Sequence, residues 1–361
     1  MEISELRKIT DAFVEELDMA QRGNKTSLPF IVNQFPDHPL VPEHDDFLVL
    51  VIGGTIFQVA RCRKEHGQIL ILRKRAGELV AFSNKDTFLR FVEELIPDDV
   101  KYVAVNFAYP LSPLFKKNKL DGILISGTKE HTFDGLVGLV VGDTIEAYLK
   151  EKRGQVVTVS TANDTICELL SGVSKASRPE FLACGIVGTG VNFAFFMDSH
   201  HAVNLEAANF NKFPQSKYGK KIDEHSQHPN QALFEKETSG GYLFQHMNLF
   251  SEEHGLDLKL KSSKELDDYA KKCEVATEGD ACAFAWELLD RSAGLVACQI
   301  AGITRYKAAD MIFIMAGSLF WKAFNYKESV SKYVKILVPE YNVTFITIEN
   351  CEIYGAARLV A

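Results

Sequence analysis

This sequence of 361 residues has no long apolar stretch, no paired cysteines and no excess of basic residues. Its uninterrupted apolar runs, such as residues 47–52, are far too short to cross a bilayer, so no membrane partner is expected. The seven cysteines include no C-x-x-C pair, which predicts neither a disulfide framework nor a zinc site. Lysine and arginine number 40 against 48 acidic residues, and basic stretches such as 116–119 are short and expected to be solvated. No nucleic-acid partner is therefore expected.

The location predicted from these absences is the cytoplasm. Isolated cysteines suit a reducing compartment, and residues 1–5 lack both the cationic start and the apolar core of a signal peptide. With 46% hydrophobic residues the chain can bury a sizeable core, and its length allows one large or two ordinary domains.

Hydrophobic periodicity divides the chain into two halves of similar organisation. In the first half we expect helices over 3–17, 84–95 and 139–152, strands over 47–52, 56–62, 68–72, 102–107 and 155–160, and an irregular connector over 24–46. In the second half we expect strands over 181–187, 193–196, 311–315 and 343–348, and helices over 282–303, 328–336 and 354–359. Each half contains a hairpin around a glycine turn, which predicts a duplicated α/β fold with a cleft between the halves.

The two glycine turns are Gly53-Gly54-Thr55 and Gly188-Thr189-Gly190. Either one can be a simple hairpin connection, because glycine supplies the positive φ that tight turns need. Backbone amides at glycine turns also form concavities that bind phosphate oxygens, and threonine adds a hydroxyl donor. One such turn in each half suits a protein that holds a triphosphate from both sides.

A carboxylate stands where a buried strand is expected to give way to a helix, at Asn163-Asp164-Thr165. In open α/β sheets, ligands bind outside the carboxyl ends of the strands. A carboxylate at that place can take a proton from a substrate hydroxyl. The alternative is that Asn163 or Asp164 only caps the helix over 166–170. The residues themselves leave both interpretations open.

Short segments spread from residue 47 to residue 361 match one known family in order and spacing. They are LVIGGTIFQV at 50–59, FAYP at 107–110, GILISGTK at 122–129, NDT at 163–165, GTGVN at 188–192, NLE at 204–206, LFEK at 233–236, the apolar stretch 291–303 and AGS at 316–318. On these segments the chain resembles the hexokinase family, within the actin-like sugar-kinase superfamily. The resemblance implies a two-lobed, actin-like and ribonuclease H-like duplicated α/β fold, with a sugar-binding cleft between a small and a large domain.

The resemblance also implies roles for individual residues. Asp164 would be the general base on the terminal hydroxyl of a sugar. The other sugar hydroxyls would be held by Thr128, Lys129, Asn163, Asn192, Glu206 and Glu235. The nucleotide would be bound by Gly53, Gly54, Thr55, Gly188, Thr189, Gly190, Gly317 and Ser318, and no residue is assigned as a metal ligand. Carboxylates and amides match sugar hydroxyls, which both donate and accept. Without the resemblance, we would expect Lys129 to be a surface lysine and residues 235–237 to form a solvated helix face.

Four positions depart from the family pattern. Val51 replaces an aspartate that helps to hold the Mg²⁺ of the nucleotide, and Gln58 replaces an arginine. Ala108 and Ala316 replace a serine in the sugar segment and an aspartate in the adenosine segment. The sugar-binding half of the pattern is therefore better kept than the nucleotide and metal half.

The function predicted from the resemblance is transfer of the γ-phosphate of Mg-ATP to the 6-hydroxyl of glucose or a related hexose such as fructose or mannose. ATP and Mg²⁺ are the expected cofactors, and the protein is expected to be a monomer or a homodimer. The alternative, supported by Val51, is a sugar-binding regulator or sensor with attenuated kinase activity. The expected domains are an N-terminal helix and connector (1–42) packed on the large domain, a small domain (43–162, with the C-terminal helix 354–361) and a large domain (163–353).

Overall fold

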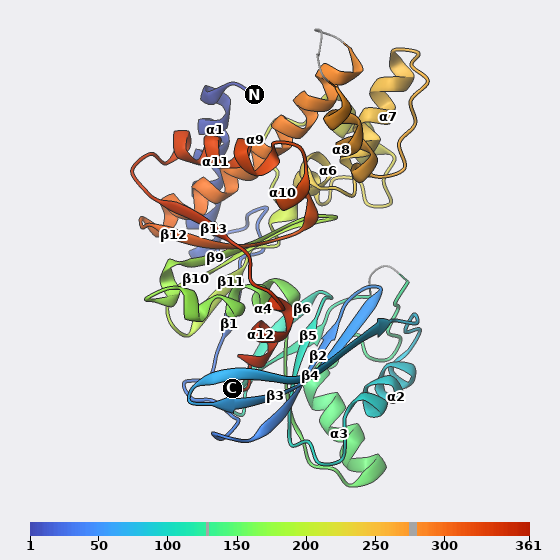
Figure 1. Ribbon diagram of the computed structural model, residues 1–361, viewed down its shortest axis with the longest axis vertical. Helices are drawn as coiled ribbons and strands as arrows, with labels where there is room; N and C mark the ends of the chain where they lie inside the picture. Colours follow the sequence, from blue (N-terminus) through green and yellow to red (C-terminus); the bar gives the residue numbers. More distant parts are fainter. Residues whose placement is uncertain (128–129, 274–279) are drawn as a thin grey trace. The chain divides into compact units, whose positions relative to one another are not determined.

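The computed structural model describes residues 1–127, 130–273 and 280–361. Its contacts divide the chain into two compact units. Unit 1 consists of Met1–Phe30, Ala183–Phe195 and Asn204–Thr347. Unit 2 consists of Ile31–Leu182, Phe196–Val203 and Ile348–Ala361. Each unit therefore draws on segments that lie far apart in the sequence (Figure 1).

A five-stranded sheet forms the centre of unit 2, with the strand order β4-β3-β2-β5-β8. These strands are β2 (Asp46–Ile52), β3 (Ile56–Glu65), β4 (Gln68–Glu78), β5 (Tyr102–Phe107) and β8 (Thr158–Ala162). The first three form an antiparallel meander, and β5 and β8 run parallel to β2. β2 and β8 run parallel, so their carboxyl ends lie at the same edge of the sheet. The first glycine turn and the start of the helix after β8 are therefore both at this edge.

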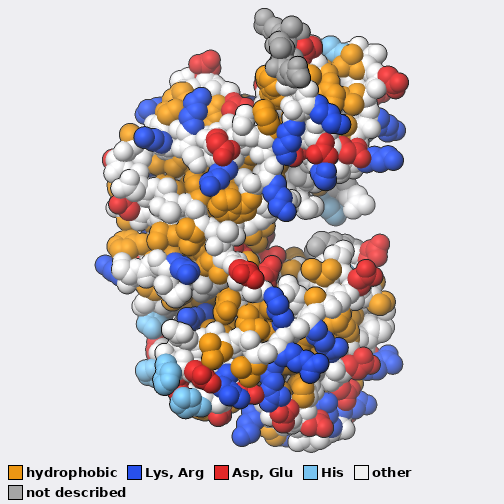
Figure 2. Space-filling view, viewed as in Figure 1, with side chains coloured by type: hydrophobic (Ala, Val, Ile, Leu, Met, Phe, Trp, Pro, Cys, Tyr) orange, Lys and Arg blue, Asp and Glu red, His pale blue; other side chains and the backbone are white. Residues whose placement is uncertain are grey.

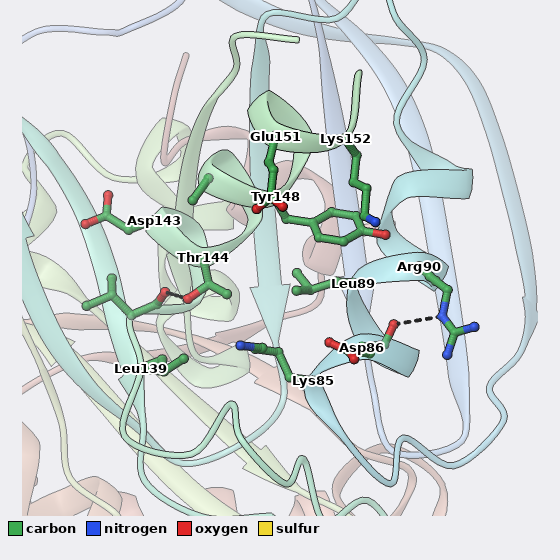
Figure 3. Close-up of a pocket in the computed structure, with 12 residues that line it drawn as sticks. Lys85, Asp86, Leu89, Arg90, Leu139, Asp143, Thr144, Tyr148, Glu151 and Lys152 are labelled. Atoms are coloured by element: carbon green, nitrogen blue, oxygen red, sulfur yellow. Dashed lines mark hydrogen bonds between the residues drawn. The ribbon is translucent and has the colours of Figure 1, made fainter. Parts of the chain in front are cut away.

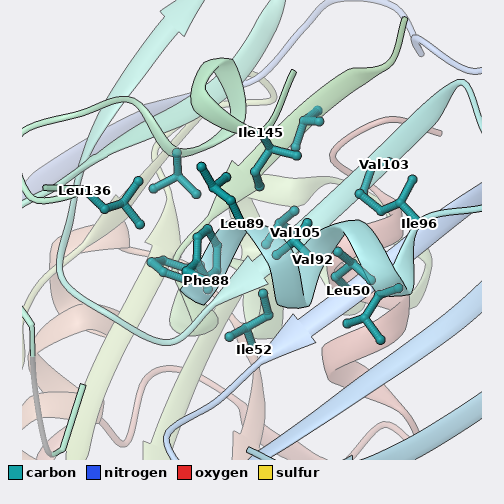
Figure 4. Packing of buried hydrophobic residues seen from close by; sticks show 14 of the residues in the cluster. Leu50, Ile52, Phe88, Leu89, Val92, Ile96, Val103, Val105, Leu136 and Ile145 are labelled. Atoms are coloured by element: carbon teal, nitrogen blue, oxygen red, sulfur yellow. The ribbon is translucent and has the colours of Figure 1, made fainter. Parts of the chain in front are cut away.

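Helices cover both faces of this sheet. α2 (Lys85–Leu95) and α3 (Val141–Arg153) pack on one face, where Leu50, Phe88 and Ile145 belong to one buried apolar cluster (Figure 4). α2 begins in a capping box, because Asn84 and Thr87 satisfy each other's backbone amides. The other face carries α12 (Cys351–Ala357), which also packs on α4 (Asp164–Ser171). The approach is close enough that a Cβ on Gly355 would lie 1.7 Å from the carbonyl oxygen of Cys167.

Unit 1 contains strands in the order β10-β9-β12-β13. They are β9 (Leu182–Val187), β10 (Val191–Phe196), β12 (Met311–Ala316) and β13 (Val343–Ile346). β9 and β10 form the second antiparallel hairpin, and β12 and β13 are parallel. The long helix α9 (Ala281–Lys307) is buried along most of its length, and α1 (Ile3–Gln21) and α11 (Tyr326–Leu337) pack on it. The shorter helices of the unit are α5 (Lys217–Glu224), α6 (Leu233–Thr238), α7 (Leu243–Glu253), α8 (Ser263–Lys272) and α10 (Ser318–Lys322).

The helices and strands expected from periodicity are present, with ends that shift by a few residues. Several expectations were wrong. The connector 24–46 contains a short strand, β1 (Ile31–Gln34), and the hairpin of β6 (Leu111–Lys116) and β7 (Lys119–Leu124) was not expected. Lys119, expected to be solvated, is only 2% exposed, because its ammonium group is paired with the carboxylates of Asp121 and Glu146 at 3.3 and 2.6 Å.

A further correction concerns the cysteines. Cys273 at the end of α8 and Cys282 in the first turn of α9 form a disulfide, although the sequence predicted none. Their spacing is too wide for the C-x-x-C pattern on which the prediction relied. The other five cysteines form no disulfide. In the ranges that the structure describes, no helix is long and apolar enough to span a membrane.

Candidate active site

The Asn163-Asp164-Thr165 segment joins β8 to α4 in unit 2. Asn163 is the N-cap of α4, and its side-chain oxygen accepts the backbone N–H of Thr165 at 3.0 Å. Asp164 is the first residue of the helix and is half-buried, with one carboxylate oxygen 2.8 Å from the same N–H. The capping role considered from the sequence therefore falls mainly to Asn163. The carboxylate of Asp164 lies at the carboxyl end of a parallel strand, where ligands bind in open α/β sheets.

The first glycine turn connects β2 to β3 in the same unit. The backbone N–H of Gly53 donates to the carbonyl of Ile56 at 3.1 Å, and the N–H of Leu79 donates to the carbonyl of Thr55 at 2.9 Å. Gly53 does not adopt a positive φ, contrary to the reason first given for a glycine here. A Cβ on Gly53 would instead lie 3.1 Å from the carbonyl oxygen of Ile56, so the residue permits a tight approach of backbone to backbone.

The second glycine turn lies in unit 1 between β9 and β10. Gly188 and Gly190 also lack a positive φ, and the N–H of Gly188 donates to the carbonyl of Gly190 at 3.0 Å. The N–H of Gly240 in turn donates to the carbonyl of Gly188 at 2.7 Å. Gly317 has a φ of +103°, and a Cβ on Gly188 would be 3.2 Å from its Cα atom. A Cβ on Gly317 would lie 2.1 Å from the carbonyl oxygen of Val187, so three glycine-bearing segments meet at a place where Gly317 leaves no room for a larger residue.

A cavity of about 540 Å³ borders this junction in unit 1. It combines backbone from the glycine segments with side chains on or beside α8 and α10, which include three lysines, three serines and two aspartates. The lining residues are Gly188, Thr189, Gly240, Ser262, Ser263, Lys264, Asp267, Asp268, Lys271, Ser318, Leu319, Lys322 and Ala323. Gly188, Thr189 and Ser318 of the predicted nucleotide set thus line one cavity. Its size and its mixture of cations, hydroxyls and tight backbone suit a nucleotide.

The two glutamates predicted to hold a sugar also belong to unit 1. The side-chain amide of Asn204 donates to the carboxylate of Glu206 at 2.8 Å, and its oxygen accepts from the amide of Asn192 at 2.8 Å. Glu235, on α6, accepts the backbone N–H of Val191 at 3.2 Å. Burial raises the pKa of Glu235, and the nearby charge of Glu206 raises it further. The structure thus brings Asn192, Glu206 and Glu235 together with the second glycine turn.

Residues 235–237 do not form a solvated helix face. Lys236 is 2% exposed, and its ammonium group bonds to Asp223 at 2.5 Å and to the carbonyl of His228 at 2.9 Å. Glu237 is 1% exposed and pairs with Arg291. These buried charges fix α6 in place and therefore fix the orientation of Glu235. Their burial was not visible in the sequence, where three successive charged residues resemble a surface.

Two parts of the expected site remain without structural support. Thr128 and Lys129 lie outside the described residues. Val51 is 9% exposed on β2, opposite Gln58 on one side and Asn106 on the other, so the end of β2 beside the glycine turn offers no carboxylate to a metal. Among the described residues there is no group of three histidine, cysteine, aspartate or glutamate side chains that could hold a metal ion. The metal contact of the family pattern therefore does not fit the residues at Val51.

A cavity of about 870 Å³ forms a groove between α2 and α3 of unit 2 (Figure 3). Lys85, Arg90 and Lys152 alternate there with Asp86 and Glu151, and none of the predicted site residues lines it. Mixed charges of this kind also cover the face of the molecule shown in Figure 2. The groove consequently carries no sign of selectivity for one class of ligand.

Comparison with known proteins identifies relatives over nearly the whole chain. A family model described as "Hexokinase" matches residues 1–174, and a second model of the same description matches residues 183–252 and 255–361. The hexokinase of Kluyveromyces lactis is 29% identical over 281 residues, which are 68% of this chain and 57% of that protein. Hexokinase-1 of Saccharomyces cerevisiae is 28% identical over 296 residues, which are 70% of this chain and 60% of that protein. The chain thus spans about three fifths of the length of these curated relatives.

Solved structures agree on the fold. The hexokinase from Schistosoma mansoni complexed with glucose superimposes with a TM-score of 0.80 at 21% identity, covering 100% of this chain and 95% of that chain. The ROK hexokinase from Thermus thermophilus superimposes with a TM-score of 0.61 at 13% identity, covering 88% of this chain and 98% of that chain. The mixed α/β architecture predicted from the sequence is therefore confirmed as that of hexokinase structures.

Proposed function

The chain belongs to the hexokinase family, and from this premise we propose that it transfers the γ-phosphate of ATP to the 6-hydroxyl of glucose or a related hexose. The observation that carries the proposal is the placement of Asp164. Its carboxylate follows a parallel strand and stands in the first turn of a helix whose N-cap residue is Asn163. A carboxylate at that position is suited to take the proton of an attacking hydroxyl.

We propose that Glu206, Glu235 and Asn192 hold the remaining hydroxyls of the sugar, together with Asn163. Hydroxyl groups both donate and accept, so they pair well with carboxylates and amides that are already oriented by other bonds. The chain of bonds from Asn192 through Asn204 to Glu206 supports this role, as does the anchoring of α6 by Lys236. Thr128 and Lys129 are assigned to the sugar by family resemblance alone.

For the phosphoryl donor we propose the cavity beside Gly188 and Gly317 as the nucleotide site. Phosphoryl transfer depends mainly on positioning and on stabilisation of charge, and backbone amides at glycine turns supply both. The family implies Mg²⁺ bound to the nucleotide, where it would neutralise phosphate charge. Val51 gives it no ligand on β2, so the proposed roles of the residues of this chain do not depend on a metal contact at that position.

We propose a cytoplasmic location on the basis of the thiols. Five of the seven cysteines form no disulfide, whereas Cys273 and Cys282 are disulfide-bonded. Free thiols are usual in a reducing compartment.

The proposal is tested by measuring the product formed from glucose and Mg-ATP by the purified full chain. Coupled detection of the 6-phosphate gives the rate, and phosphorus NMR identifies the position that carries the phosphate. We expect ATP-dependent formation of the 6-phosphate. Glucose binding by calorimetry without any turnover would contradict the proposal and would favour a sugar-binding regulator with lost activity, in keeping with Val51.

A further inference from the structure

Two buried side chains hold the carbonyl groups of the first glycine turn in unit 2. The hydroxyl of Tyr109 donates to the carbonyl of Gly53 at 2.7 Å. A ring nitrogen of His131, Nε2, lies 2.9 Å from the carbonyl oxygen of Gly54. Tyr109 and His131 are 1% and 3% exposed, and their ring centroids are 5.5 Å apart. Two successive peptide groups of the turn are therefore tied to the interior of the unit.

The second nitrogen of His131 determines which tautomer the ring adopts. The backbone N–H of Phe82 donates to Nδ1 at 3.1 Å, so this nitrogen accepts and carries no proton. A neutral imidazole has one donor and one acceptor, which places the proton on Nε2, where it is donated to Gly54. The neighbouring N–H of Thr132 donates back to the carbonyl of Phe82 at 3.0 Å. The ring thus has both its position and its donor direction fixed by backbone.

Fixing these two carbonyls also fixes two amides. In a trans peptide the C=O and the following N–H point in opposite directions, and no peptide bond among the described residues is cis. Holding the carbonyl of Gly53 inward turns the N–H of Gly54 outward, and holding the carbonyl of Gly54 does the same for the N–H of Thr55. In the described ranges of the chain, neither of these two amides donates to a backbone carbonyl. Consecutive outward amides are the arrangement that binds phosphate oxygens.

We propose that Tyr109 and His131 are positioning residues that hold the first glycine turn in its phosphate-binding form, with the amides of Gly54 and Thr55 directed at the phosphoryl donor. The inference rests on the proposed kinase function. It also goes beyond that function. The family pattern has phenylalanine at the position of Tyr109, so the hydroxyl group of Tyr109 is a feature of this chain. With Val51 offering no metal ligand on the preceding strand, the preset amides are the contribution that this segment makes to the phosphates.

The test compares nucleotide affinity in Tyr109→Phe, His131→Gln and His131→Leu with that of the full wild-type chain. Tyr109→Phe removes only the hydroxyl. His131→Gln keeps an amide donor for Gly54, whereas His131→Leu keeps none. We expect Tyr109→Phe to weaken binding of Mg-ATP and to raise its KM by about 2- to 10-fold, the value of one neutral hydrogen bond. We expect His131→Leu to lose more affinity for Mg-ATP than His131→Gln does. The glucose Kd should stay within twofold in all three.

A matched control is Tyr148→Phe. The Tyr148 hydroxyl donates to Glu93 at 2.8 Å in the α2–α3 groove of the same unit, and its removal should change neither constant. Thermal melts establish that each variant is folded. If a histidine variant does not fold, the result for Tyr109→Phe alone tests the positioning role, because phenylalanine fits the space of tyrosine. Wild-type ATP affinity in a folded Tyr109→Phe protein overturns the positioning role while leaving the kinase proposal intact. A wild-type chain that binds no ATP overturns both.

Discussion

At the residue scale, the Asn163-Asp164 pair shows how one motif allows two roles. The sequence alone could not separate a helix cap from a catalytic base, because both need a short polar side chain at a helix start. In the structure Asn163 is the cap. The carboxylate of Asp164 accepts the same N–H of Thr165, so the capping geometry alone does not separate the two roles, and the catalytic role stays a proposal.

Glu206 and Glu235 should set the affinity for sugar. We expect Glu206→Gln and Glu235→Gln each to weaken glucose binding by about 10- to 100-fold, because each variant loses a hydrogen bond to a charged group, worth about 1.5–3 kcal/mol. Calorimetry with glucose measures the effect. Glu224→Gln, at an exposed position on α5, is the control and should bind like the wild type. Unchanged affinity in both test variants would remove these glutamates from the sugar site.

Val51 should limit the response to Mg²⁺. We expect Val51→Asp to raise kcat or to lower the Mg²⁺ concentration needed for half-maximal rate, because one carboxylate can orient a hydrated Mg²⁺ ion. Val51 is only 9% exposed, and burying an unpaired carboxylate is costly, so a thermal melt must first show that the variant is folded. A folded variant with unchanged turnover and unchanged Mg²⁺ dependence would contradict the assignment of this position to the metal.

At the scale of elements, the contact between α4 and α12 contains a buried acid that the reaction does not use. Glu168, on α4, is 4% exposed and is hydrogen-bonded with the thiol of Cys351. Burial raises the pKa of Glu168 to about 7, and the charges of Glu352 and Asp164 raise it as well. The contact between the helices is therefore most favourable when this carboxyl group is neutral.

This raised pKa predicts how stability depends on pH. The unfolded chain releases the proton of Glu168 near pH 4.5, whereas the folded chain keeps it up to about pH 7. The folded state thus binds more protons in this window, and stability falls as the pH rises through it, by up to about 3 kcal/mol. We expect Glu168→Gln to melt increasingly above the wild type between pH 5 and pH 7, with a constant difference above that. If the melting temperatures of the variant and the wild type kept a constant difference between pH 5 and pH 7, ionisation of Glu168 would not destabilise the folded state, and the prediction would be wrong.

Several elements could be predicted because local patterns agree with the fold. The amphipathic spacing of α1 matches the side of the helix that packs, and the apolar run of β5 matches a strand that is buried on both faces. The β6–β7 hairpin was missed because Pro113 interrupts the strand pattern, although it pairs with Gly122. The Cys273–Cys282 disulfide was missed because it depends on where two helix ends meet rather than on a short spacing.

The parts of the candidate site that are formed by continuous segments of the chain could be predicted from the sequence. The glycine turns and the Asn163-Asp164 segment are continuous in sequence, so their residue types could be recognised. The bonds of Tyr109 and His131 to the first turn, and of Lys236 to Asp223, join positions 13 to 77 residues apart. No local pattern indicates such contacts, because they depend on the packing of separate elements.

At the scale of the whole molecule, the residues proposed for the reaction are divided over both units. Unit 2 carries Asp164 and the first glycine turn, and unit 1 carries Glu206, Glu235 and the cavity beside Gly317. Activity is therefore expected of the full chain. Experiments on isolated units would not test the proposal.

The central claim is that Asp164 is the base that activates the sugar hydroxyl. The most direct test measures glucose phosphorylation and glucose affinity in Asp164→Ala. Asp143→Ala serves as the control, since it removes a carboxylate from the first turn of α3 in the same unit. The account predicts that Asp164→Ala lowers kcat by at least about 10²- to 10⁴-fold while the glucose Kd changes only a few-fold, and that Asp143→Ala retains turnover. Near-wild-type turnover in a folded Asp164→Ala protein would contradict it.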